Sequence, residues 1–367
     1  MNHKKFSTII LCVLYACLAS LALLNIVVDP YEIFRTPFLT RQTQVNDRYS
    51  KIESLSKNKG KYNSYILGSS RMAHTSPDIL AKYLPGAKFY NLATALATPY
   101  EHLLHLKYFI KNGYPVKNLY IGLDIDLCFG VKMHKEKELL LKLHPEVLNK
   151  SWIGYYWSYL TVFPKTDIRR KLRLNFSRKA KPIQISEEDG AWTFGEEAKD
   201  ARVFVVDPAI NDTSIIKNEV KEENVAGLRE LAALCRQHEI NLILFITPHN
   251  KLFMDRFAVE DYLAFLRKLS AITSFWDFSG YNSITIHYEN YLDYSHYKSS
   301  VSRMIAARIF GDKTFTVPED FGVRVTEEGI DSHLENLRMN IKTNREEGRS
   351  FHLRTQTKAG ESSLKSP

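Results

Sequence analysis

The chain has 367 residues, a net charge of +9 at pH 7 and a hydrophobic content of 44%, which is enough to form a large core. Two of its cysteines, Cys12 and Cys17, lie in an apolar N-terminal segment. The other two neither make a disulfide framework nor show the spacing of a metal site, and the chain has no glycine-rich phosphate loop. We therefore expect no metal, nucleotide or other cofactor.

The N-terminal segment predicts a membrane anchor. Residues 6–28 are uncharged and long enough to cross a bilayer as a helix, and Lys4 and Lys5 precede them. By the positive-inside rule, we expect a single-pass anchor in the cytoplasmic (inner) membrane, in contact with its lipid, with the following domain on the periplasmic or extracellular side. A cleaved signal peptide is the alternative, although its apolar core is usually about 7–15 residues long. A lipoprotein signal at Cys17 is disfavoured because the apolar segment continues well beyond it.

The positive charge of the chain has two interpretations. It can be a solvated surface near anionic lipid, or it can attract acidic glycans. Nucleic acid is not expected as a partner of a domain that lies outside the membrane.

After a polar stalk at residues 29–62, apolar segments alternate with helical patterns. Helices are expected to begin at Ser76, which precedes Pro77, and at Thr98, where Glu101 completes a capping box. Expected strands cover residues 65–67, 88–92, 118–125, 241–246 and 275–278. Further helices are expected over residues 223–239, 261–269 and 296–310. Strands that are apolar on both faces and alternate with helices predict an α/β fold, a three-layer α/β/α sandwich with a central parallel sheet in a flavodoxin-like arrangement.

The domain predicted from this pattern covers residues 63–311, with an insertion at 129–215 where the alternation is lost. The insertion reads as a cap that holds a cluster of aromatic residues: Trp152, Tyr155, Tyr156, Trp157 and Tyr159. These rings can be ordinary packing of the cap, can stack on sugars, or can lie at the membrane interface. A basic run follows them within residues 169–181. The remaining residues 312–367 read as a polar C-terminal tail that is partly disordered.

Two short segments far apart in the chain carry the candidate chemistry. Residues 65–71 (Tyr-Ile-Leu-Gly-Ser-Ser-Arg) read as a strand that breaks at a glycine into two serines. Residues 293–296 (Asp-Tyr-Ser-His) place a carboxylate three positions before a histidine. Nucleophilic acyl chemistry needs a hydroxyl, a base that takes its proton and a group that orients the base. Ser70, His296 and Asp293 are the candidates for these three catalytic roles.

The order and context of these two segments resemble the SGNH (GDSL-type) hydrolase superfamily. In that family a Gly-x-Ser follows the first strand and an Asp-x-x-His precedes the last helix. The resemblance covers Asn63 to Gly311, with an interruption in the middle, and implies that Ser70 is the nucleophile. Ser69 stands where the family most often has aspartate.

Two other blocks of the family are less well matched. After the second expected strand, the chain has Asn91 and then Ala93, near the place of a glycine whose backbone N–H contributes to the oxyanion hole. Alanine can keep that role. After the third expected strand, Asp124 stands where the family has an asparagine whose amide donates to the oxyanion. An ionised aspartate donates no hydrogen bond, so it would oppose a developing oxyanion.

Further polar residues follow the expected strands, where sites gather in an open parallel sheet. Arg71 can anchor an anionic substrate or pair with Asp124. Asp126 reads as a solvent-facing strand end. His249 is a candidate for a substrate contact at the same edge, and His74 is expected on the surface.

From this resemblance, we expect a membrane-anchored serine esterase or O-acyltransferase that acts on an acyl ester of a cell-envelope or extracellular polysaccharide. A membrane-bound acyl-donor protein is a candidate partner. The alternative is a non-catalytic scaffold or glycan-binding protein with the SGNH fold, working in a polysaccharide biosynthesis or export assembly. The aspartate at position 124 is the main feature that favours this alternative.

Overall fold

A computed structural model describes residues 3–36, 38–41, 46–129, 133–134, 138–176, 184–186, 188–193, 221–293 and 295–362, without the side chains of residues 347–362. The first part of the chain forms α1 (His3–Val28), α2 (Asp47–Lys57), β1 (Ser64–Leu67), α3 (Pro77–Ala81), β2 (Phe89–Asn91), α4 (Pro99–Lys111), β3 (Asn118–Leu123) and α5 (Ile125–Phe129). The insertion forms η1 (Leu139–Leu141), α6 (Pro145–Leu148), α7 (Trp152–Leu160), α8 (Lys165–Phe176), β4 (Gln184–Ile185) and β5 (Trp192–Thr193). The last part forms α9 (Glu222–Gln237), β6 (Asn241–Ile246), α10 (Lys251–Met254), α11 (Val259–Ser270), β7 (Phe275–Asp277), η4 (Tyr288–Asn290), α12 (Ser299–Phe310), β8 (Val323–Val325) and α13 (Ile330–Ser362).

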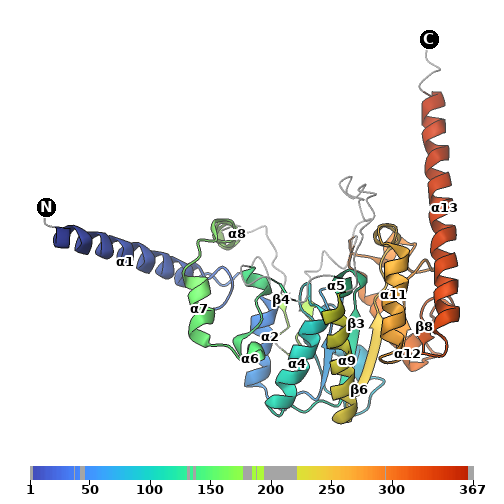
Figure 1. Cartoon of the computed structure of the whole chain (residues 1–367), viewed down its shortest axis with the longest axis horizontal. Coiled ribbons are helices and arrows are strands. Elements are labelled where there is room, and N and C mark those ends of the chain that lie inside the picture. The colour runs from blue at the N-terminus through green and yellow to red at the C-terminus, as the bar shows by residue number, and fades with distance from the viewer. Residues whose placement is uncertain are drawn as a thin grey trace.

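A six-stranded sheet with the order β2-β1-β3-β6-β7-β8 forms the centre of the domain. Neighbouring strands from β2 to β7 in this order are parallel, whereas β8 pairs with β7 antiparallel. Figure 1 shows α4 and α9 side by side in front of the sheet, α1 extending away from one end of the domain and α13 rising at the other end. The predicted α/β fold with a central parallel sheet is therefore confirmed in outline, with one antiparallel edge strand as a correction.

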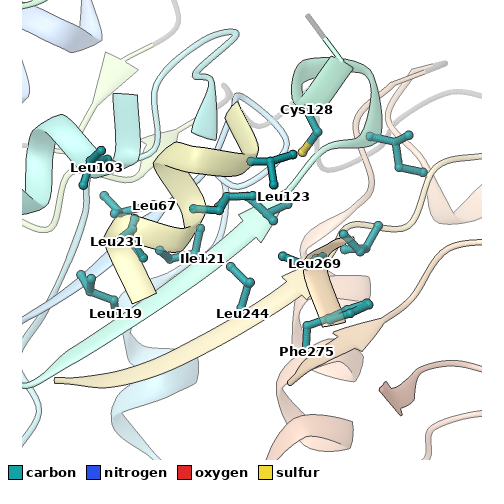
Figure 2. Packing of buried hydrophobic residues seen from close by; sticks show 14 of the residues in the cluster. Leu67, Leu103, Leu119, Ile121, Leu123, Cys128, Leu231, Leu244, Leu269 and Phe275 are labelled. Atoms are coloured by element: carbon teal, nitrogen blue, oxygen red, sulfur yellow. The ribbon is translucent and has the colours of Figure 1, made fainter. Parts of the chain in front are cut away.

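Alternate side chains of the central strands enter two separate apolar clusters. Leu119 and Ile121 of β3 belong to one cluster, where they pack with Leu231 of α9 (Figure 2). The intervening Tyr120 and its neighbour Phe245 of β6 belong to the other cluster, together with residues of α3 and α12. Because successive side chains of a strand point to opposite faces of the sheet, both faces of these strands are buried. This explains why the strands appear in the sequence as continuous apolar segments.

The helix that precedes β3 follows its predicted start. The Thr98 hydroxyl oxygen accepts a hydrogen bond from the backbone N–H of Glu101 at 3.3 Å, which confirms the predicted N-cap. The strand predicted over residues 118–125 ends earlier, at Leu123, and α5 follows almost at once. Asp126 therefore lies in the first turn of a helix and not at a strand end.

The stalk predicted over residues 29–62 is wrong in both halves, because Tyr31 and Ile33 are buried in an apolar cluster with residues of the insertion, and α2 is part of the core. Ile52 and Leu55 have exposed fractions of 0% and 1%. The charged residues that suggested a solvated segment are buried as well: the guanidinium of Arg48 donates to the carboxylate of Glu101 on α4 at 2.8 Å. A charged helix can be buried when each charge finds a partner, and here the partner lies 53 residues further along the chain.

The predicted end of the domain at residue 311 is also wrong. Residues of the expected polar tail supply β8 at the sheet edge and the long helix α13. Ile330, Leu334, Leu337 and Ile341 repeat at helical spacing on α13 and are buried in the larger apolar cluster. Residues 363–367, at the end of the tail where disorder is expected, lie outside the described residues.

The insertion is attached to the edge of the sheet at β2. The carbonyl of Asp189 accepts the backbone N–H of Asn91 at 2.7 Å, and the N–H of Trp192 donates to the carbonyl of Ala73 at 2.8 Å. Gly190 has a positive φ of 75°, and a Cβ at this position would lie 2.4 Å from the Asn91 carbonyl oxygen. Only glycine allows this close approach. Residues 177–183 and 194–220, which include part of the basic run, lie outside the described residues.

Candidate active site

Ser70 lies just beyond the carboxyl end of β1, next to a turn that requires glycine. Gly68 has a φ of 149°, and a Cβ there would lie 2.3 Å from the Cγ of Met72. The turn places the Ser70 side chain beside the segment that precedes α12, and the residue is partly exposed. The position of Ser70 at the edge of a parallel sheet agrees with the place where such sheets collect functional groups.

His296 and Asp293 meet Ser70 in the predicted geometry. The Nε2 atom of His296 lies 2.9 Å from Ser70 Oγ, and Nδ1 lies 2.8 and 3.0 Å from the two carboxylate oxygens of Asp293. The Asp293 carboxylate also accepts the backbone N–H groups of Ser295 and His296, at 2.7 and 2.8 Å. The geometric prediction for these three side chains is therefore confirmed; their catalytic role stays a prediction.

The environment of Asp293 keeps its carboxylate ionised. Burial alone would raise the pKa of Asp293, but the hydrogen bonds from the His296 ring and from two backbone N–H groups lower it below its ordinary value. An ionised Asp293 holds a proton on Nδ1 of His296 and leaves Nε2 free to accept the Ser70 proton. The side chain of His296 is 26% exposed, so a substrate can reach this pair from solvent.

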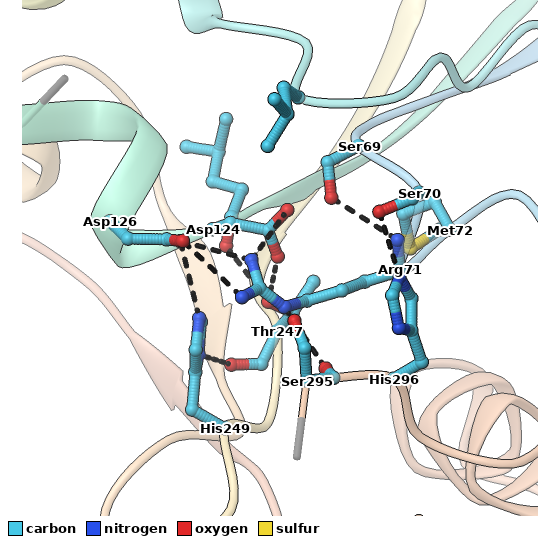
Figure 3. Close-up of polar contacts among 12 residues, drawn as sticks. Ser69, Ser70, Arg71, Met72, Asp124, Asp126, Thr247, His249, Ser295 and His296 are labelled. Atoms are coloured by element: carbon cyan, nitrogen blue, oxygen red, sulfur yellow. Dashed lines mark hydrogen bonds and ion pairs between the residues drawn. The ribbon is translucent and has the colours of Figure 1, made fainter. Parts of the chain in front are cut away.

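Arg71 crosses the site and joins three loops (Figure 3). Its Nε donates to the carbonyl of Ser295 at 3.1 Å, and its Nη1 and Nη2 donate to the two carboxylate oxygens of Asp126 at 2.9 and 3.3 Å. Nη1 also lies 3.3 Å from Asp124 Oδ2. Since Ser295 is adjacent to His296, this arginine ties the turn that carries Ser70 to the loop that carries His296. The carboxylates of Asp124 and Asp126 occupy the guanidinium, so Arg71 is not an open anchor for an anionic substrate.

The carboxylate of Asp124, which stands in the position of the family's oxyanion asparagine, is part of a buried polar network. Its side chain is 1% exposed, pairs with Arg71 and accepts the hydroxyl of Thr247. This pairing is one of the two alternatives that the sequence leaves open for Arg71. An aspartate at this position serves as a counter-charge for the buried guanidinium of Arg71. This pairing explains the aspartate at position 124 without a role in binding an oxyanion.

Asp126 and His249 form the far side of the same network. Asp126 is not a solvated strand end. Burial alone would raise its pKa, but the charges and hydrogen bonds of Arg71 and His249 outweigh this effect and hold the pKa below its ordinary value. His249 Nε2 lies 3.5 Å from Asp126 Oδ1, and the ring stacks on Phe253 with 5.0 Å between centroids. His249 is 1% exposed, which corrects its prediction as a substrate contact at the rim.

Asn91 and Ala93 shape the loop after β2. The Asn91 amide nitrogen donates to the carbonyls of Met72 and Thr75, both at 2.9 Å, and its oxygen accepts the Ala93 N–H at 2.9 Å. Ala93 is fully buried and its carbonyl accepts the ammonium of Lys51 at 2.5 Å. The predicted oxyanion role of Ala93 is therefore wrong, because its N–H is already bound.

Two other backbone N–H groups are candidates for that role. Among the residues that the structure describes, no acceptor lies on the N–H of Ser70 or of Leu96. Leu96 has a φ of 55°, a conformation that is rare for leucine, and its side chain is 45% exposed. Its loop is joined to the turn that carries Ser70 by the hydrogen bond from the Thr94 N–H to the Gly68 carbonyl at 3.1 Å. No pattern in the sequence indicates this conformation of Leu96, since a positive φ is usually marked by glycine.

The structure places two residues beside His296 that were not predicted there: His74, which follows β1, and Trp192 of the cap. His74, expected on the surface, is 7% exposed and lies between His296 and Trp192, with ring centroids 6.0 and 5.8 Å away. Burial and the neighbouring His296 lower the pKa of His74 to about 3, so that it is neutral at physiological pH. Trp192 of the cap packs against the other side of this neutral ring.

We compared the chain with models of protein families, with curated proteins and with solved structures, and none of the three comparisons gave a match.

Proposed function

We propose that this chain is an SGNH-type serine esterase or O-acyltransferase that works at a membrane. The observation that carries the proposal is the relay from Asp293 through His296 to Ser70, with contacts of 2.8 and 2.9 Å. In the first step Ser70 Oγ attacks the ester carbonyl while His296 takes its proton. The leaving alcohol then receives that proton from His296, and an acyl-serine remains. Water or an acceptor hydroxyl, deprotonated by His296, then attacks the acyl carbonyl; the bond to Ser70 Oγ breaks and His296 returns the proton to Ser70.

The arrangement of the sheet supports this chemistry, whereas one hydrogen-bond donor that would stabilise an oxyanion is missing. The two apolar clusters on a mostly parallel sheet support a three-layer α/β/α sandwich of the SGNH type. The asparagine donor of that family is absent at position 124, so we assign oxyanion stabilisation to the N–H groups of Ser70 and Leu96. Backbone donors aimed at a developing oxyanion are sufficient to stabilise it when they are held rigidly.

The proposed substrate is an acyl ester on a cell-envelope or extracellular polysaccharide. The warrant is the layout of the chain, with α1 long and apolar enough to cross a membrane directly before the catalytic domain. A net charge of +9 would favour acidic glycans. A membrane-bound protein that delivers the acyl group is the partner that a transferase of this kind would need.

The decisive experiment uses a serine-directed fluorophosphonate on the purified full chain. The wild type should be labelled and should hydrolyse acetyl esters, whereas Ser70→Ala should lose both properties. Ser69→Ala is the matched control, because its hydroxyl accepts only the Arg71 N–H among the described contacts, at 3.2 Å. Labelling that persists in Ser70→Ala would refute the proposed nucleophile.

A non-catalytic scaffold or glycan-binding protein is the second candidate. It is favoured by the aspartate at position 124 and by the bound N–H of Ala93, which remove two donors that an SGNH enzyme would use. This candidate predicts that the wild type is not labelled and that Ser70→Ala leaves the envelope polymer unchanged.

The orientation in the membrane has its own test. We propose that the domain lies on the periplasmic or extracellular side of the cytoplasmic membrane, because Lys4 and Lys5 precede the apolar segment. Protease added to intact spheroplasts should digest the domain. Protection until the cells are lysed would place the domain in the cytoplasm and contradict the proposal.

A further inference from the structure

The outer face of α7 is apolar, although none of the residues that the structure describes covers it. The helix Trp152–Leu160 contains no charged residue. Its inner face buries Tyr155 and Tyr159, whereas Ile153 and Trp157, one turn apart, are 81% and 60% exposed. The outer face of a helix on a water-soluble domain is normally polar, so this face indicates a partner.

The apolar surface continues into the next segment, and cations border it. Val162 and Phe163, between α7 and α8, are 42% and 58% exposed, and Phe176 at the end of α8 is 81% exposed. The exposed basic residues of α8 are Lys165, Arg169, Arg170 and Arg173. Aromatic and aliphatic side chains together with a row of cations are the composition of a helix that lies in a membrane interface.

This surface is fixed to the end of α1. The Asn25 amide donates to the carbonyls of Leu160 and Val162 at 3.1 and 2.8 Å, and the Lys171 ammonium donates to the carbonyl of Asp29 at 3.0 Å. Figure 1 shows α7 and α8 as the parts of the domain beside the C-terminal end of α1. A bilayer crossed by α1 would therefore end at the level of α7 and α8.

We propose that α7, the segment at residues 161–164 and α8 form a platform that lies in the headgroup region of the bilayer that α1 crosses. The occupant is phospholipid: the acyl boundary covers Ile153, Trp157 and Phe163, and anionic headgroups bind the arginines of α8. The inference rests on the part of the proposed function that places α1 across a membrane. The platform and the bonds of Asn25 hold the catalytic domain at a fixed height and orientation above the bilayer, so its substrate is one presented close to the membrane surface.

Site-directed fluorescence on the full chain in nanodiscs tests the platform. The exposed Cys12 and Cys17 are replaced by serine, while Cys128 and Cys235 are buried and can remain. An environment-sensitive label is then placed at Ile153→Cys or Phe163→Cys. Leu14→Cys within α1 is the reference inside the membrane, and Met339→Cys on α13, 54% exposed, is the reference in water.

We expect a nitroxide phospholipid to quench the labels at positions 153 and 163 as it quenches position 14, and iodide to quench them several-fold less than position 339. Labels at 153 and 163 that behave like the one at 339, while position 14 is quenched by lipid, would overturn the platform and leave the anchor intact. Loss of lipid quenching at position 14 would overturn both the platform and the membrane-spanning anchor. Shielding from iodide without lipid quenching would identify a protein contact, such as a second copy, and would also refute the proposal.

The cations of α8 are tested in the same assay. Arg170→Glu combined with Arg173→Glu should reduce lipid quenching at position 163 several-fold in nanodiscs that contain phosphatidylglycerol. In pure phosphatidylcholine the same variant should match the parent, because no anionic headgroup is lost. Equal quenching of parent and variant in both lipids would refute the role of anionic headgroups.

Discussion

Replacing Arg71 with alanine should destabilise the domain strongly, because its guanidinium is the buried counter-charge of two carboxylates. The side chain of Arg71 is 5% exposed, that of Asp124 1% and that of Asp126 26%. Removing one partner of a buried ion pair costs about 3–5 kcal/mol, since the remaining charge is left without compensation. For a domain of this size, such a change lowers the melting temperature by roughly 10 °C.

The effect should depend on pH in a defined direction. In the wild type the pKa of Asp126 lies below its ordinary value, so its contribution to stability is complete above the unfolded pKa and is lost only as the pH falls through the lower folded pKa. Without Arg71, only His249 still lowers the pKa of Asp126 against the effect of burial, so the pKa in the folded variant is higher than in the folded wild type. The folded variant therefore binds a proton at a higher pH than the folded wild type does, and the difference in stability between wild type and Arg71→Ala should shrink as the pH falls through the folded pKa of the variant.

The assay is thermal melting of the full chain in nanodiscs, followed by tryptophan fluorescence at several pH values. Arg338→Ala is the matched control, because Arg338 makes the same two-bonded contact with Glu260, at 3.0 and 2.9 Å, but on the surface. Its loss should hardly change the melting temperature. Arg71→Lys should recover part of the stability and still lose activity, because lysine keeps the charge but not the fork that reaches Ser295. A melting temperature of Arg71→Ala within the range of the Arg338→Ala control, or a difference from wild type that does not change with pH, would refute this reasoning.

Three further substitutions have distinct expected outcomes. Asp293→Asn should reduce ester turnover by about 10³–10⁴-fold with little change in melting temperature, because the amide holds His296 in the wrong tautomer; turnover near wild type would exclude the relay. Asp124→Asn should lower stability by about 1–3 kcal/mol in urea unfolding without raising activity, because it weakens hydrogen bonds to a charged partner; a gain in activity would place this residue at the oxyanion instead. Gly190→Ala should loosen the cap from Asn91 and speed proteolysis within the insertion, whereas unchanged cleavage would contradict the close approach seen there.

Much of the fold is determined locally and is therefore readable from the sequence. The uncharged segment at residues 6–28 forms most of α1, and continuous apolar segments form β3 and β6. These features depend on the burial of whole segments, which leaves a pattern along the chain. The same holds for the relay: Gly68 permits the turn that presents Ser70, and Asp293 contacts His296 three residues away.

The tertiary structure alone decided which charges are buried and which backbone groups remain available. Arg48 and Glu101 lie 53 residues apart and appear solvated in sequence until they pair inside the core. The Ala93 N–H donates to the Asn91 side chain and is not available for another acceptor, and Leu96 has a positive φ that a leucine does not predict. Hydrogen bonds and ion pairs are pairwise and short-ranged, so their energies depend on neighbours that the fold brings together and not on the residues next to them in the chain.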